Sequence, residues 1–221
     1  MISLGLHEFA HAWVACRCGD TTARDMGRMT PDPRAHIDPI MTIAVPALML
    51  LLTGFVFGGA KPVPVNYGRL RHPARDMMLV ALAGPLMNVL IAVFLTAALK
   101  LCLTGFVMGG PGDTALGYTL YPYLNPDLGG PENVATSVLS WSIFANLILA
   151  IFNMLPIPPL DGSRVVAFFL PGPLRGTFMA LDRFSMLIVV ALLFSGLLSP
   201  VIVNAYEPLA RTVDLVTAAQ W

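Results

Sequence analysis

Charged residues are scarce in this sequence. Asp, Glu, Lys and Arg make up 12% of its 221 residues, whereas hydrophobic residues make up 56%. A soluble domain carries about 25% charged residues, so this composition, with a mean hydropathy of +0.73, predicts a protein embedded in the lipid bilayer. The formal net charge is zero. We therefore expect no nucleic-acid partner, because binding to the phosphate backbone needs an excess of basic residues.

Cysteine is rare as well, and the three residues are Cys16, Cys18 and Cys102. None of them forms a CxxC pair, and the odd number excludes a complete set of intramolecular disulfides. Cys16 and Cys18 lie close to a histidine in the sequence, which leaves a thiolate zinc site open as an alternative. Because alternate residues point to different faces of a helix, we interpret these cysteines as packing residues.

A secretory signal peptide is also missing, since no basic region precedes the first apolar run. That run, residues 1–16, is shorter than the roughly 20 residues that a membrane-spanning helix needs. We therefore expect the natural chain to begin upstream of Met1 or to have been shortened there.

Long apolar runs account for most of the remaining sequence. Windows of about 19 residues predict helices in these runs, and the runs lie at 1–16, 40–59, 77–103, 134–155 and 184–205. We predict an all-α membrane protein, a bundle of about four to five transmembrane helices. The whole chain, residues 1–221, is expected to form a single membrane-embedded domain.

The distribution of charge predicts the orientation in the membrane. Arginine is concentrated in residues 17–34 and 61–75, whereas residues 103–133 contain no Lys or Arg. Basic loops remain in the cytoplasm, so both Arg-rich stretches are expected there. The sequence thus predicts a multi-pass protein of the cell membrane.

The apolar run at 40–59 lies between the two basic stretches. A single spanning helix would put those stretches on opposite sides of the membrane, in conflict with their charge. A re-entrant segment that returns to the cytoplasmic side removes the conflict, and a spanning helix remains the alternative. The run contains residues typical of a bend, namely Pro46, Gly54, Gly58 and Gly59.

A His-x-x-x-His pattern at the start of the chain carries the strongest chemical signal. His7 and His11 are four residues apart and share a helix face, so both imidazoles can reach one metal ion. Glu8 adjoins the first histidine and can address a water molecule on that ion. Ionisable side chains inside a membrane are costly and normally mark function, so we favour a metal site over a structural polar cluster.

A catalytic zinc ion keeps three protein ligands and one open position. Asp161 is the candidate for the third ligand, because it follows a proline-rich segment that cannot form a regular helix and can aim a carboxylate into a cavity. Gly162 permits a close approach or an unusual backbone conformation directly after it. The alternative is an ordinary turn at the membrane surface.

These motifs resemble the site-2 protease family of intramembrane zinc metalloproteases, and most of all its compact bacterial members without PDZ or CBS modules. The resemblance covers about residues 3–170, and the matching segments are residues 7–11, 27–33, 36–39, 60–66, 83–88 and 153–162. It implies transmembrane helices around a Zn²⁺ ion below the cytoplasmic face, with re-entrant strands that hold an unwound substrate. It also implies substrates that are themselves membrane proteins.

The expected mechanism follows from these parts. Zinc lowers the pKa of its bound water toward about 7 and polarises the carbonyl to be cleaved. Glu8 takes the proton of that water and delivers it to the leaving amine. The reaction needs water, and a broken, proline-rich segment is tolerated at membrane depth where it lines a water-filled cavity.

Four other polar residues are considered for a role in the site. Asn88 and Asn153 are amides within apolar runs and are candidates for binding the substrate backbone or the oxyanion, although Asn88 could equally form an interhelical hydrogen bond beside Gly84. His36 and His72 are interpreted as surface residues, and a role in the site is the alternative for His36.

Two other classes of protein compete with the protease. A non-catalytic membrane scaffold for metal, or a zinc transporter, could use the same ligands, but a transporter needs charged residues along its path and the apolar runs have few. A soluble protease with the same motif is excluded by the hydropathy. The sequence makes no prediction of an oligomeric state.

Overall fold

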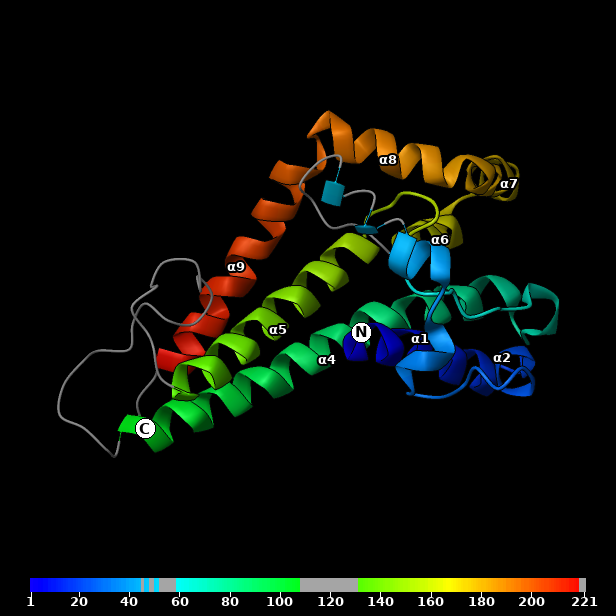
Figure 1. Ribbon diagram of the computed structural model, residues 1–221. Helices are drawn as coiled ribbons and strands as arrows, with labels where there is room; N and C mark the ends of the chain where they lie inside the picture. The colour runs from blue at the N-terminus through cyan, green and yellow to red at the C-terminus, as the bar shows by residue number, and fades with distance from the viewer. Residues whose placement is uncertain (45, 48–49, 52–58, 108–130, 219–221) are drawn as a thin grey trace. The chain divides into compact units, whose positions relative to one another are not determined.

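The structure, a computed structural model, describes all residues except 45, 48–49, 52–58, 108–130 and 219–221. Within these described ranges every regular element is helical, which confirms the all-α prediction (Figure 1). The re-entrant strands that the family resemblance implies do not occur in these ranges. The longer helices are α1 (Ile2–Arg17), α4 (Pro73–Val107), α5 (Pro131–Asn153), α8 (Ser185–Ser195) and α9 (Leu198–Ala218). The shorter ones are α2 (Thr22–Asp25), η1 (Pro33–His36), η2 (Pro39–Ala44), η3 (Tyr67–Arg69), α6 (Asp161–Phe169), α7 (Gly172–Met179) and η5 (Ala180–Phe184).

The chain divides into two compact units. The first comprises Met1–Met87 and Met154–Ser185, and the second comprises Asn88–Asn153 and Met186–Trp221. The first part of α4 belongs to the first unit and the rest of that helix to the second. That residues 1–221 form a single membrane-embedded domain remains a prediction.

Helix α1 ends in a turn that a buried carboxylate stabilises. Gly19 follows the helix with a φ of +110°, a conformation that favours glycine. Asp20 is 1% exposed, and it accepts hydrogen bonds from the Thr22 amide at 3.0 Å and from the Asn66 amide at 2.6 Å. The turn is therefore tied to a segment more than forty residues away in sequence.

Residues 59–66 return to the first part of the chain in an irregular conformation. The Lys61 amide donates to the His36 carbonyl at 2.8 Å, and the Arg28 guanidinium donates to the Pro62 carbonyl at 3.3 Å. Near the start of the apolar run 40–59, the Thr42 hydroxyl donates to the Gly59 carbonyl at 2.8 Å. The beginning and the end of the apolar run 40–59 thus lie side by side, although most of its interior is outside the described residues.

The prediction that His36 lies at the surface is wrong. Its side chain is 2% exposed, and its Nε2 atom lies 3.0 Å from the Thr30 carbonyl oxygen. His36 is buried because the loop 28–38 folds against α1, so closely that a Cβ atom at Gly5 would lie 3.3 Å from the Pro33 Cα atom. His72 is exposed, as predicted.

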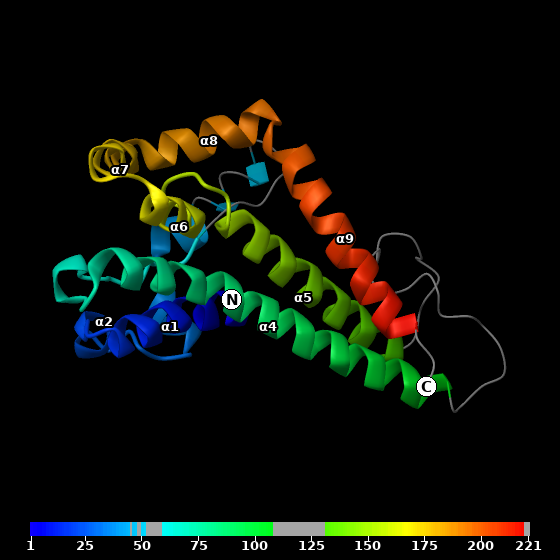
Figure 2. The same ribbon diagram turned by 180° about the vertical axis from the view of Figure 1, so that it is seen from behind.

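Three helices supply the hydrophobic core of the second unit among the described residues. The later part of α4 supplies Ala92 and Leu99 to its core, α5 supplies Ile143 and Leu147, and α9 supplies Ala210. Helices α5 and α9 run side by side in both views (Figures 1 and 2). Other large apolar side chains of α4 point outward, as expected for contact with lipid, and Phe94 is 73% exposed.

The predicted spans agree with the helices to different degrees. Among the described residues, one helix, Pro73–Leu101 within α4, is long and apolar enough to cross a membrane. The run 134–155 corresponds to α5, and the run 1–16 to α1. The run 184–205 is not one helix, because α8 ends and α9 begins around Gly196, which has a φ of +71°. The number of spans remains a prediction.

Candidate metal centre

Helix α1 brings His7 and His11 together, as their spacing predicts. Both side chains are buried, and their Nε2 atoms are 3.0 Å apart. The two rings meet edge to face, with their centroids 4.6 Å apart. The two nitrogens therefore face a common point beside the helix, rather than solvent.

Asp161 reaches the same point from the second segment of the unit, residues Met154–Ser185. It is the first residue of α6, directly after the non-helical segment that contains the prolines. Gly162 allows this approach, since a Cβ atom at that position would lie 2.5 Å from the Leu155 carbonyl oxygen and would also collide with the Met154 carbonyl. The prediction that Gly162 serves a close approach is confirmed.

The three side chains form a small triangle of potential ligand atoms. Asp161 Oδ2 lies 3.3 Å from His7 Nε2 and 3.4 Å from His11 Nε2. A tetrahedral zinc ion with bonds of about 2.0–2.1 Å places its ligand atoms about 3.3–3.4 Å apart. Asp161 Oδ2 is also buried without a hydrogen-bond partner in the described part of the chain. The donor set and its spacing fit zinc.

A second contact fixes the protonation of His11. Its Nδ1 atom lies 2.7 Å from the Val80 carbonyl oxygen, which can only accept, so Nδ1 carries the proton. In the neutral imidazole, the lone pair of Nε2 is then directed at the triangle. Backbone carbonyls commonly hold the outer nitrogen of metal-bound histidines in this way.

Glu8 lies beside the triangle on the same helix. Its side chain is 9% exposed, and Oε2 accepts a hydrogen bond from the Val63 amide at 2.8 Å. A buried carboxylate next to a metal site suits a group that exchanges a proton with water.

Sequence reasoning gave Gly84 no role at the metal centre, yet it borders the triangle directly. A Cβ atom at this position of α4 would lie 2.5 Å from His7 Nε2 and even closer to His11 Nε2. Only glycine leaves the space in front of both nitrogens open. The available signal was a glycine in the middle of an apolar helix, where it is otherwise unfavourable.

Asn88 and Asn153, predicted to bind substrate, belong to the second unit. Asn88 is fully buried, and its amide atoms have no hydrogen-bond partner among the described residues. Asn153 donates to the Leu149 carbonyl of its own helix at 2.9 Å. His7, Glu8 and Asp161 all lie in the first unit, and a substrate role for the two amides remains a prediction.

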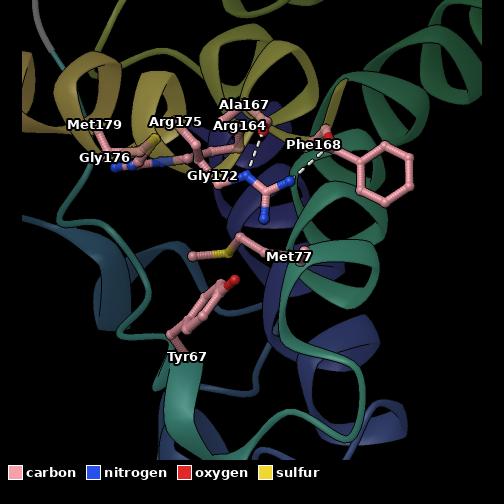
Figure 3. A pocket seen from close by; sticks show the side chains of 10 residues that line it. Tyr67, Met77, Arg164, Ala167, Phe168, Gly172, Arg175, Gly176 and Met179 are labelled. Carbon is pink, nitrogen blue, oxygen red and sulfur yellow. Dashed lines mark hydrogen bonds between the residues drawn. The ribbon is translucent and has the colours of Figure 1, made fainter. Parts of the chain in front are cut away.

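A cavity of about 510 Å³ also lies in the first unit, between η3, α4, α6 and α7. Tyr67 and Met77 line one side of it, and the Arg175 guanidinium faces them from the other (Figure 3). Arg175 donates to the carbonyls of Ala167 at 2.7 Å and Phe168 at 3.0 Å. These bonds satisfy the last backbone carbonyls of α6. Arg175 therefore caps the C-terminal end of the helix that begins at Asp161.

Comparison with known proteins gives a consistent classification. The model of the family described as Peptidase family M50 matches residues 1–196. "Putative zinc metalloprotease YwhC" of Bacillus subtilis is 32% identical over 197 residues, which are 89% of this chain and 78% of that protein. "Putative zinc metalloprotease Rip2" of Mycolicibacterium smegmatis is 29% identical over 200 residues, 90% of this chain and 66% of that protein. No solved structure matches significantly.

The helical fold, the site and these matches together define a zinc metallopeptidase associated with the membrane. The chain belongs to peptidase family M50, the site-2 protease family. Family membership argues against the alternatives of a non-catalytic scaffold and a zinc transporter. The chain spans about half of a further relative, "Putative zinc metalloprotease Rip2" of Mycobacterium tuberculosis H37Rv. The two are 32% identical over 162 residues, which make up 52% of that protein.

Proposed function

We propose that the protein is an intramembrane protease that hydrolyses peptide bonds in or near the transmembrane segments of other membrane proteins. His7, His11 and Asp161 hold the zinc ion, and Glu8 is the general base and acid. The observation that carries the proposal is the buried triangle of two imidazole nitrogens and a carboxylate oxygen, with sides of 3.0, 3.3 and 3.4 Å.

The side chains divide the work of hydrolysis among them. Zinc, when bound, supplies a water molecule of lowered pKa and a positive charge that polarises the carbonyl. Glu8 accepts a proton from the attacking water and passes it to the nitrogen of the leaving amine, so that the C–N bond breaks without releasing a strong base. The hydrogen bond from His11 to the Val80 carbonyl keeps the imidazole in the required tautomer.

The protein crosses the cell membrane several times, and its active site opens toward the cytoplasmic side. The run 40–59 is re-entrant in this topology. The hydrogen bond between Thr42 and Gly59 supports it, because a spanning helix of about 20 residues would separate its two ends by about 30 Å. Both Arg-rich stretches then remain in the cytoplasm.

The catalytic assignment is tested by Glu8→Gln in the full chain, reconstituted with zinc in liposomes. The substrate is a single-span reporter protein with a fluorophore on each side of its transmembrane segment. The variant should retain about one zinc per chain, measured by mass spectrometry, and lose cleavage by at least about 1,000-fold. Cleavage at the rate of the unchanged protein would refute the role of Glu8.

A further inference from the structure

The contact between Glu8 and Val63 joins the proposed general base to a segment 55 residues further along the chain. The bond is short, at 2.8 Å, and its acceptor is buried. A carboxylate rotates freely about its last torsion unless a partner holds it, because this torsion has a broad distribution. The Val63 amide therefore selects one orientation of Glu8 and leaves the second oxygen to face another group.

The local sequence makes Val63 the single donor at this place. Its neighbours are Pro62 and Pro64, and proline has no backbone N–H group. The tripeptide 62–64 thus offers one amide proton, and that proton is directed at Glu8.

Buried polar groups outside the triangle hold this segment in place on both sides of Val63. The Lys61 amide is bound by the His36 carbonyl, and the Asn66 amide by the Asp20 carboxylate. Asp20 is 1% exposed and His36 is 2% exposed. Neither residue approaches the metal ligands in any described contact, and the hydrogen bonds of both give the segment 61–66 a fixed position relative to α1.

We propose that Val63 is a positioning residue, whose backbone amide orients the Glu8 carboxylate for proton transfer, and that segment 61–66 is the brace that holds this amide. The inference rests on the proposed role of Glu8 in catalysis. A hydrogen bond to a charged group is stronger than one between neutral groups, and a misplaced catalytic group costs about 100-fold in rate. Loss of the amide proton should therefore lower kcat by about 10- to 100-fold.

Val63→Pro removes this one proton, and Val63→Ala is the matched control that keeps it and shortens the side chain. Val63 precedes a proline and is therefore already confined to extended conformations, which a proline also adopts. In the zinc-loaded full chain, Val63→Pro should lower kcat by about 10- to 100-fold with unchanged KM and zinc content. Val63→Ala should remain within about threefold of the unchanged protein.

Equal kcat values for the two variants would overturn the proposal. If Glu8→Gln is inactive and the two Val63 variants have equal kcat values, the positioning role of Val63 is refuted and the proposed function stands. If Glu8→Gln is active, the proposed function itself is refuted.

A second measurement does not depend on activity or on the folding of Val63→Pro. Protein labelled with ¹⁵N-valine reports the Val63 amide by NMR, and Val63→Ala assigns its signal. Glu8→Ala should shift the Val63 amide proton upfield and speed its exchange with solvent by at least about tenfold, with Val65 little changed. An unmoved Val63 signal would contradict the contact.

Discussion

The two units of this protein differ in the partners of several of their polar side chains. In the first unit, Glu8 and Asp20 bind amides that are 55 and 46 residues away in sequence. In the second unit, Thr96 and Asn153 each bind a carbonyl four residues earlier in the same helix. The first pattern fixes separate segments around a site, whereas the second only satisfies polar groups within an apolar helix. Substitutions in the two units should therefore damage different properties.

The largest effect is expected at Asp161. Asp161→Ala removes one of the three proposed ligands and should weaken zinc binding by more than about 100-fold, since even outer-shell changes cost 10- to 100-fold. Asp182→Ala is the matched control, because Asp182 pairs with Arg164 at 2.6 Å and is not part of the triangle. Titration with a competing chelator measures both affinities. Full zinc occupancy in Asp161→Ala would count against the ligand assignment.

Gly84→Ala should have the next largest effect. The added methyl group would meet both imidazole nitrogens, so the side chains of His7 and His11 must move away from it and the zinc content should fall at least about tenfold. Gly176→Ala is the matched control, because its Cβ atom meets no atom within 4 Å and alanine favours the α7 helix. If both variants bind zinc equally well, the close approach of α4 to the ligands is not required.

The second unit should respond in stability rather than in chemistry. Ile143 is fully buried in its core, and Ile143→Ala should lower the free energy of unfolding by about 2–4 kcal/mol. The zinc content of the folded protein should not change. Val93, which is 62% exposed on α4, provides the control, and Val93→Ala should change stability by less than about 0.5 kcal/mol. Thermal unfolding in detergent compares the stability of the two variants. Loss of zinc from folded Ile143→Ala would contradict the prediction that the second unit affects stability and not the metal centre.

Local periodicity explains what the sequence could predict. The helical repeat places His7 and His11 on one face, and the coordination of zinc requires a third ligand such as Asp161. Periodicity and ligand counting cannot identify Gly84 or Val63. Gly84 acts through the absence of a side chain, and Val63 acts through its backbone amide proton. The burial of His36 was missed because it depends on how the loop folds onto α1. The division of 184–205 was missed because a positive φ at Gly196 has no periodic signal.

X-ray absorption at the zinc edge of the purified, zinc-loaded full chain tests the central claim most directly. The account predicts nitrogen and oxygen neighbours only, at about 2.0–2.2 Å, with the scattering pattern of two imidazole rings. A sulfur neighbour at about 2.3 Å, as Cys16 or Cys18 would supply, or the pattern of a single imidazole, would contradict it.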